Sequence, residues 1–326
     1  MRVGQLTSSG PGLTRYQFVT ALVANGDAIR DGLKKGKAVL FMQIKEQPGA
    51  FGALISGIDL SQNLSAETRS ELREHWLRHQ VVGFPDQKLS VYDLERFAEI
   101  LGDFGEDPFF ESIKDHPHVA EVRRAADEQT PLFAESWHSD WSFLQTPPTA
   151  TLLFGEMIPP HGGDTLFANQ YAAFEALEPS FKAQISALQG IHSAARGYAP
   201  DGLYGEADEG RTMAIRYSPE AYKTQCHPIA KVHPETGRTA LFVNPGYTVG
   251  IEGLSEDESW PILMRLFEHQ TQQDFIYRHH WDADMLVVWD NRCVLHAATG
   301  GYDGYDRLLK RITVTGLPEG TQALSQ

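Results

Sequence analysis

The sequence has little cysteine and little positive charge for its length. Its 326 residues include two cysteines, 28 lysines and arginines, and 43 aspartates and glutamates, which gives a formal net charge of −15. Two cysteines exclude a disulfide framework and a cysteine-rich zinc site. A negative surface without a basic run repels phosphate backbones, so we expect no nucleic acid partner.

The sequence also has no long apolar run. No stretch approaches the roughly 18 uninterrupted apolar residues of a membrane helix. The first residues carry scattered charges, including Arg2 and Arg15, where a signal peptide would have an apolar core. We therefore expect no membrane association and a cytoplasmic location.

The hydrophobic pattern predicts a mainly β fold with flanking helices. Helices are expected over 65–78 with Ser65 as N-cap, over 90–101 with Ser90 and Asp93 as a capping box, and over 170–189 and 259–270. Short strands separated by turn residues predict a sandwich or barrel, and they are expected over 53–60, 81–84, 119–123, 136–143, 149–155, 239–243, 274–280, 284–289 and 311–315.

Nothing in the composition separates two large domains. Residues 1–40 are interpreted as an N-terminal appendage, with apolar spacing typical of a helix over 14–35 and a short strand over 38–42. Residues 41–326 are interpreted as one domain.

The most informative residues are His138, Asp140 and His296. Residues two apart in a strand face the same side, roughly 6.6 Å apart along the backbone, so His138 and Asp140 can reach one metal ion. His-x-Asp alone is a weak signal, but a buried strand over 284–289 leads through a turn to His296. Two histidines and one carboxylate form the facial triad of non-haem iron(II) oxygenases, which leaves positions open for co-substrate and oxygen.

Two arginines follow the last histidine at a regular spacing. Arg307 and Arg311 are four residues apart, so in a strand both face the same side, separated by roughly 13 Å. A guanidinium binds a carboxylate through two parallel hydrogen bonds. A dicarboxylate that chelates a metal through its keto-acid end needs such a group at its far end.

These elements together resemble the taurine dioxygenase family, which includes the 2,4-dichlorophenoxyacetate dioxygenases, over residues 45–318. The resemblance rests on motifs in family order and with family spacing, at 52–60, 77–87, 137–140, 162–165, 242–244 and 289–311. It implies a double-stranded β-helix (jelly-roll) core and an oxidoreductase that uses Fe(II), 2-oxoglutarate and O₂. It also implies a small-molecule substrate, release of succinate and CO₂, and a homo-oligomer such as a dimer or tetramer.

The resemblance also assigns roles to individual residues. It implies that His138, Asp140 and His296 hold the iron, and that Arg307 and Thr165 bind the distal carboxylate of 2-oxoglutarate with Trp289 packed nearby. Halogenating relatives lack the carboxylate that Asp140 provides, so hydroxylation is favoured. On the substrate side, the resemblance implies that Arg311 receives an anionic group and that Tyr247 lines the pocket.

This sequence departs from the taurine enzymes at three places on the substrate side. Asp107, Phe110 and Ala134 stand where those enzymes have a His, a Tyr and an Asn. An acidic residue in place of the His would repel a sulfonate, so we expect a substrate other than taurine. The expected class is a small carboxylate, sulfonate or sulfate ester.

Other functions stay open at this point. The same iron centre can catalyse desaturation or cyclisation, and the same triad with zinc serves a hydrolase or lyase, while a metal-free jelly roll could be a binding protein. Among the other histidines, His116 and His118 are expected in a loop. His227 and His233 either line the pocket or lie exposed in loops, and the second arrangement is the commoner one.

Overall fold

The computed structural model describes residues 42–47 and 51–316. The chain divides into a unit of residues 1–43 and a unit of residues 44–326. The elements below belong to the second unit, apart from the first residue of β1. The helix expected over 14–35, and the strand over 38–42 except its last residue, lie outside the described residues.

The largest sheet has nine strands in the order β1-β2-β3-β15-β7-β17-β6-β5, with β4 paired to β17. Neighbours from β3 to β6 pair antiparallel, whereas β2 and β3 pair parallel. The strands are β1 (Gln43–Glu46), β2 (Ala53–Ser56), β3 (Val81–Phe84), β4 (Asp103–Phe104), β5 (Ser112–Ile113), β6 (His116–Arg124), β7 (Ala150–Met157), β15 (Met285–Asp290) and β17 (Arg307–Thr315).

Three smaller sheets complete the strand framework. Their orders are β14-β8-β16, β10-β9-β13 and β11-β12. The strands are β8 (Thr165–Asn169), β9 (Gln189–Ser193), β10 (Thr224–Pro228), β11 (Ala230–Val232), β12 (Thr239–Leu241), β13 (Thr248–Ile251), β14 (Ile276–His279) and β16 (Val294–Ala298). The mainly antiparallel strands confirm the predicted mainly β, jelly-roll fold.

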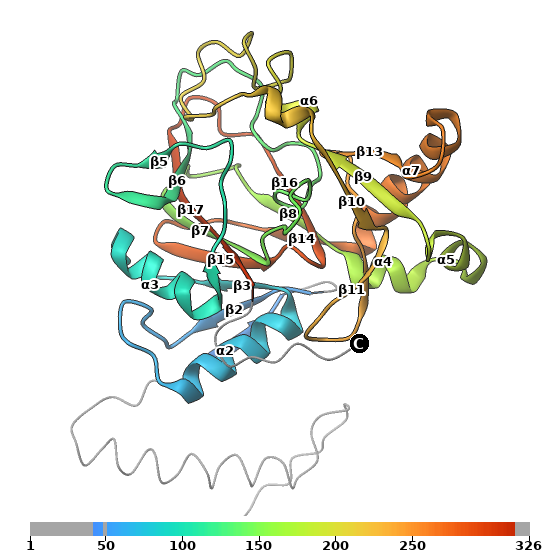
Figure 1. The fold of residues 1–326 in the computed structure, drawn as a ribbon. Coiled ribbons are helices and arrows are strands. Elements are labelled where there is room, and N and C mark those ends of the chain that lie inside the picture. Colours follow the sequence, from blue (N-terminus) through green and yellow to red (C-terminus); the bar gives the residue numbers. More distant parts are fainter. Residues whose placement is uncertain (1–41, 48–50, 317–326) are drawn as a thin grey trace, which may run out of the picture. The chain divides into compact units, whose positions relative to one another are not determined.

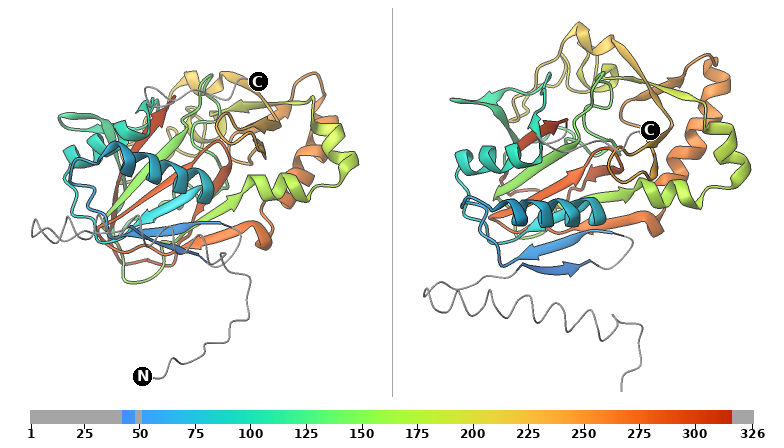
Figure 2. Two further views of the ribbon diagram at one scale, coloured as in Figure 1. Left: turned by 90° about the horizontal axis from the view of Figure 1, so that it is seen from below. Right: turned by 60° about the horizontal axis from the view of Figure 1, so that its bottom comes forward.

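The helices flank the strands, as the sequence predicts. Figure 1 shows α2 and α3 at the lower left of the strands and α4, α5 and α7 at the right, and Figure 2 gives two further views of them. Their bounds are α2 (Ala66–His79), α3 (Val91–Leu101), α4 (Gln170–Ala176), α5 (Pro179–Ile185), α6 (Ala195–Tyr198) and α7 (Glu256–Gln270), with short 3₁₀ turns η1 (Pro219–Tyr222) and η2 (Gln273–Phe275). None of the described helices is both long and apolar enough to cross a membrane.

Helix starts follow the expected capping chemistry. The Ser65 hydroxyl accepts a hydrogen bond from the Thr68 amide, and Ser90 and Asp93 form the predicted capping box. The single helix predicted over 170–189 is wrong. It is broken between α4 and α5, because Pro179 has no amide hydrogen and begins a new helix at its N-terminal end.

Two other local predictions are also wrong. Residues 136–143 are not a strand, since only His138 makes a bridge and Trp141 has a φ of +46°, which strand residues do not adopt. His116 and His118 lie in β6 rather than in a loop. His116 lies 2.8 Å from Glu95, and the ring of His118 stacks on Phe104.

Two buried clusters surround the region between β16 and β17. One packs the large sheet against β8 and β16 and includes Phe167, Val287, Trp289 and Leu309. The second is rich in aromatic rings and joins loop residues to α6, with Phe109, Phe110, Trp141, Tyr198, Tyr204 and Tyr247 among its members. The site described next lies where these clusters meet.

Candidate active site

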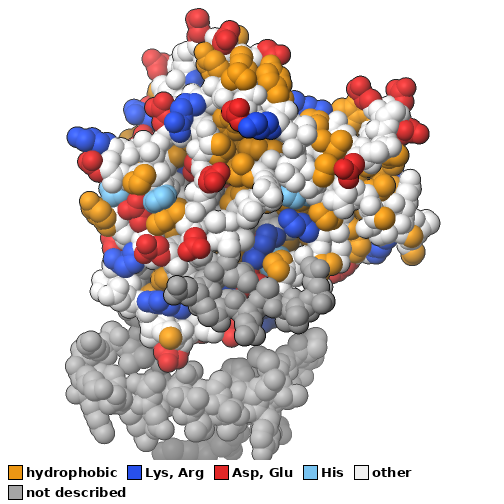
Figure 3. All heavy atoms as spheres, viewed as in Figure 1, with side chains coloured by type: hydrophobic (Ala, Val, Ile, Leu, Met, Phe, Trp, Pro, Cys, Tyr) orange, Lys and Arg blue, Asp and Glu red, His pale blue; other side chains and the backbone are white. Residues whose placement is uncertain are grey.

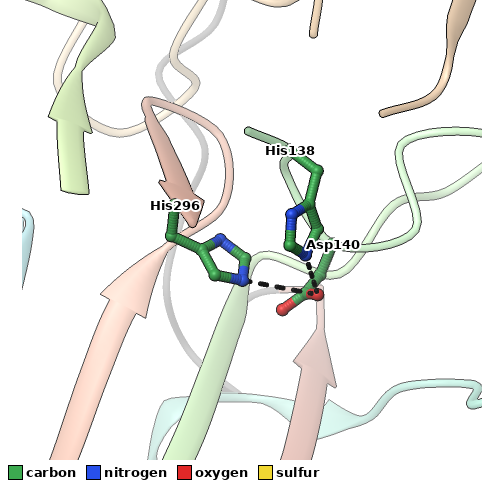
Figure 4. Close-up of side chains that lie close together, drawn as sticks. All are labelled: His138, Asp140 and His296. Carbon is green, nitrogen blue, oxygen red and sulfur yellow. Dashed lines mark ion pairs between the residues drawn. The ribbon is translucent and has the colours of Figure 1, made fainter. Parts of the chain in front are cut away.

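Three side chains from two distant segments of the chain, His138 with Asp140 and His296, point toward one another. The Nε2 atoms of His138 and His296 lie 3.7 and 3.8 Å from Oδ1 of Asp140 (Figure 4). The three candidate ligand atoms lie within 4.8 Å of one another, and all three residues are buried. Two imidazoles and one carboxylate around a common point are a donor set for a divalent transition metal.

Backbone pairing brings the two histidines together. His138 and His296 form an antiparallel bridge, in which each amide donates to the other's carbonyl at 3.0 and 2.8 Å. His296 lies in β16, whereas His138 lies in a loop. The bridge therefore fixes the loop to the end of the strand and places both rings on one side, 4.1 Å apart between centroids.

Neighbouring polar groups orient the three side chains. Nδ1 of His138 donates to the carbonyl of Ser136 at 2.8 Å, which leaves Nε2 free as a ligand. Oδ2 of Asp140 accepts a hydrogen bond from Thr151 at 2.6 Å, and Asn291 donates to the Thr151 hydroxyl at 2.8 Å. Oδ1 is thereby directed toward the histidines. Thr151 was missed by sequence reasoning, because a buried threonine in a strand has no distinguishing pattern.

The protonation states suit metal binding. Burial lowers the pKa of His138, and it lowers the pKa of His296 to about 3, so both rings are neutral near pH 7. Burial raises the pKa of Asp140, but Arg311 and the two histidines outweigh this and hold that pKa below its ordinary value. Neutral imidazole and ionised carboxylate are the forms that bind metal.

The residues fit a single metal ion with open positions. Ligand atoms on one ion lie about 3 Å apart when each bond is about 2.1 Å long, so small side-chain rotations close the observed distances. The three ligands come from one side, and the other side faces a cavity that is partly open to solvent. Such a site offers room for co-substrates, whereas a structural metal site is closed by four protein ligands.

Arg307 lies at one side of this cavity without an acidic partner among the described residues. Its side chain is buried, Nη2 donates to the carbonyl of Gly163 at 3.1 Å, and Nε has no hydrogen-bond partner in the part of the chain that the structure describes. The nearby Asp164 pairs instead with Arg278 and His280. Burial lowers the pKa of Arg307. A buried guanidinium of this kind is suited to an anionic ligand.

Gly163, two residues before Thr165, makes room for the side chain of Arg307. Gly163 has a φ of +67°, and a Cβ atom there would lie 3.1 Å from Nε of Arg307. Thr165 lines the same cavity, and its hydroxyl accepts a hydrogen bond from Trp281 at 3.0 Å. Trp289 also lines the cavity, with its ring 4.7 Å from that of His296. Arg307, Thr165 and Trp289 therefore meet in one cavity with the triad.

Arg311 is placed differently. It pairs with Asp107, and its Nη2 lies 3.3 Å from Oδ1 of Asp140. Its guanidinium lies over the rings of Phe110 and Trp141, 4.9 and 5.0 Å from their centroids. Its charge is therefore already balanced by carboxylates of the chain itself, which the sequence did not reveal, because Asp107 and Arg311 are 204 residues apart.

The remaining substrate-side candidates also line the cavity. Phe110 and Tyr247 are buried, and the ring of Tyr247 lies 5.9 Å from that of His138 in a T-shaped arrangement. Ala134 is half-buried with a φ of +59°. Sequence reasoning missed Phe133 and Tyr198, which line the same space; aromatic residues in loops and a short helix give no signal beyond hydrophobicity.

A second hollow, which is more open to solvent, adjoins the cavity and shares Phe133, Ala134, His138 and Tyr247 with it. Its lining includes Leu203, which is 52% exposed. Figure 3 shows hydrophobic side chains gathered on the surface near α6. The two spaces together lead from the surface to the histidines.

Another cluster of potential ligands, His233, Asp290 and Cys293, is occupied by internal hydrogen bonds. The side chain of Arg292 donates two hydrogen bonds to Asp290, at 2.8 and 2.6 Å, and His233 donates another at 3.0 Å. The expectation of exposed loop histidines is wrong, because His227 and His233 are both buried. Neither lines the cavity beside the triad.

The fold and the site define a class. A jelly roll that places two histidines and one carboxylate beside an open cavity is the framework of mononuclear non-haem oxygenases. Comparison of the chain with known proteins narrows this class. The chain belongs to the family described as taurine catabolism dioxygenase TauD, TfdA family, whose model matches residues 43–313.

Individual relatives cover most of the chain. It is 31% identical to an alkylsulfatase of Acinetobacter baylyi, over 84% of this chain and 85% of the relative. It is 29% identical to an alpha-ketoglutarate-dependent sulfate ester dioxygenase of Pseudomonas putida, over 85% and 90%. A crystal structure of a taurine dioxygenase from Burkholderia xenovorans matches with a TM-score of 0.70 and 31% identity, over 87% of this chain and 95% of that chain. The chain is therefore a dioxygenase by family.

Proposed function

We propose that the chain couples the oxidative decarboxylation of 2-oxoglutarate by O₂ to hydroxylation of a small organic substrate, with release of succinate and CO₂. His138, Asp140 and His296 hold one ferrous ion. When bound, this ion supplies the site for the keto acid and O₂ and the oxidising power for C–H hydroxylation. The relative from Pseudomonas putida is named for dependence on the same keto acid.

The observation that carries this proposal is the state of Arg307. A buried guanidinium without an acidic partner among the described residues is costly unless a ligand supplies the anion. Thr165 lines the same cavity as Arg307 and the triad. Its hydroxyl accepts a hydrogen bond from Trp281 and retains its own proton to donate to a ligand. Arg307 and Thr165 bind the distal carboxylate of 2-oxoglutarate, and Trp289 packs beside it. The keto-acid end then faces the triad.

The residues of the chain also separate the reaction from bulk water. Phe110, Trp141, Tyr198 and Tyr247 surround the substrate side of the triad with buried aromatic rings. Such walls hold an apolar substrate body by contact and orient its C–H bond. The names of relatives make sulfate esters, sulfonates and phenoxy acids the first anionic classes to examine.

The test is succinate formation from 2-oxoglutarate over matched pairs of candidate substrates. Suitable pairs are hexyl sulfate with hexan-1-ol and phenoxyacetate with 2-phenoxyethanol. We expect succinate only with Fe(II) and O₂, and none from Asp140→Asn, while Asp103→Asn at an exposed position keeps the wild-type rate. Conversion of a substrate with zinc and without O₂ would support the hydrolase or lyase alternative and overturn the proposal.

A further inference from the structure

Asp107 forms an ion pair with Arg311, and Arg311 lines the cavity beside the triad. The side chain of Asp107 is 17% exposed and that of Arg311 only 4%. Oδ1 of Asp107 accepts hydrogen bonds both from Arg311 and from the indole Nε1 of Trp141, the latter at 2.6 Å. The pair is thus fixed by a third side chain that also lines the cavity.

The surroundings of the pair leave little freedom to either partner. The rings of Phe110 and Trp141 both pack near the guanidinium, whose central carbon lies 4.9 and 5.0 Å from their centroids. Asp140, a proposed iron ligand, supplies a second carboxylate at 3.3 Å. Arg311 therefore already contacts two acidic groups in a mostly apolar environment.

We propose that Asp107 determines substrate selectivity by making the subsite beside Arg311 electrically neutral. The substrate places an uncharged group there, and molecules that must rest a carboxylate, sulfonate or sulfate on Arg311 are rejected. This inference rests on the proposed function, and it replaces the expectation that Arg311 receives an anion. It names the preferred substrate as an apolar molecule with a neutral polar group near the iron.

The reason is the electrostatics of a buried pair. An anion that displaces Asp107 separates a carboxylate on a side chain that is only 17% exposed from its cation. An anion that binds beside the intact pair instead adds a third negative group around one guanidinium. Both arrangements disfavour a charged head group. Nη2 of Arg311 lies 3.3 Å from Asp140 but makes no hydrogen bond among the described residues, so it can donate one to an uncharged hydroxyl or ether oxygen.

The test compares binding of phenoxyacetate and 2-phenoxyethanol to the protein loaded with Fe(II) and 2-oxoglutarate without oxygen. Calorimetry gives the dissociation constants for the wild type, Asp107→Asn and the double variant Asp107→Asn with Arg311→Gln. The wild type should bind 2-phenoxyethanol about 10-fold or more tighter than phenoxyacetate, and Asp107→Asn should reverse this order. The double variant, which restores neutrality without either charge, should again prefer 2-phenoxyethanol.

Glu106→Gln is the matched control. Glu106 is the residue before Asp107 and its side chain is exposed, so the change removes the same charge outside the buried pair. It should retain the wild-type preference. The inference is overturned if the wild type prefers phenoxyacetate, or if Asp107→Asn leaves the preference unchanged. If the single and double variants show the same preference between the two compounds, the change comes from a loosened pocket and not from the charge of Arg311. That result would also overturn the inference. Failure of the proposed function is a separate result, namely no succinate from any substrate, because binding is measured without turnover.

Discussion

Two arginines on β17, four residues apart, lie in opposite electrostatic situations. Arg307 has no acidic partner in the described part of the chain, whereas Arg311 contacts both Asp107 and Asp140. Both are buried. A buried cation needs an anion. Where the chain itself provides the anion, the arginine is part of the structure, and where it does not, a ligand is expected to provide it.

The largest effect should come from removing the guanidinium that has no internal partner. Arg307→Met should raise the KM for 2-oxoglutarate at least about 100-fold, since two charge-assisted hydrogen bonds of about 1.5–3 kcal/mol each are lost. Succinate formation against 2-oxoglutarate concentration measures this. Arg307→Lys keeps the charge and should lose less; an unchanged KM in Arg307→Met would remove the distinction between the two arginines.

Protein stability should respond in the reverse order. Arg311→Met leaves Asp107 and Asp140 without their shared cation and should lower the free energy of unfolding by about 3 kcal/mol. Arg307→Met removes a buried cation without an acidic partner and should change it by less than about 1 kcal/mol. Denaturant unfolding of the metal-free proteins provides the comparison. Equal losses in the two variants would contradict the electrostatic difference described here.

A smaller effect is expected at the glycine beside Arg307. Gly163→Ala must keep a φ of +67° and places a Cβ 3.1 Å from the guanidinium, so it should displace Arg307 and raise the KM for 2-oxoglutarate about 5–10-fold. Gly210→Ala, at a positive φ with open space around it, controls for backbone strain alone. Equal kinetic effects at both glycines would argue against the close approach.

Thr165→Val should have a modest effect of the same kind. It retains the shape of the side chain but loses one hydrogen bond to the proposed carboxylate, worth about 1 kcal/mol, or about 5-fold in the KM for 2-oxoglutarate. Thr313→Val is the control, because Thr313 lies two residues after Arg311 on β17 and does not line the cavity; it should leave the KM for 2-oxoglutarate unchanged. If Thr165→Val has no effect, the carboxylate is held by Arg307 alone.

The smallest effect should be the response of iron binding to mild acid. Protons compete with iron for an imidazole only below the pKa of that ring, and burial lowers both pKa values, that of His296 to about 3. Iron content after dialysis should therefore stay constant as the pH falls from 8 to about 6. Iron loss centred near 6.5, the ordinary histidine value, would show that the rings are not shielded.

Much of the fold could be predicted from local pattern. Capping residues and apolar spacing located α2 and α3, and the runs predicted for α7, β7 and β15 agree closely with the structure. The run predicted over 311–315 covers only the second half of β17. The helix over 170–189 failed because an apolar stripe continues across Pro179. The strand over 136–143 failed because the positive φ at Trp141 is imposed by tertiary contacts, which local sequence does not show.

The site was predictable where spacing along one strand carries the information. Arg307 and Arg311 face the same cavity, as their separation indicates. The triad required the family resemblance, because His138 and His296 meet through a bridge between segments 158 residues apart, which periodicity does not encode. The pairing of Asp107 with Arg311 was not predicted, because it joins two segments that are distant in the sequence.

The most direct measurement is an anaerobic titration of Fe(II) and then 2-oxoglutarate into the metal-free protein, followed by visible absorption. We predict one ferrous ion per chain and a weak charge-transfer band that appears only when 2-oxoglutarate is added. The band should require much more 2-oxoglutarate in Arg307→Met and be absent in His296→Ala. A wild-type protein that binds iron without developing this band, or a band of equal strength in His296→Ala, would contradict the account.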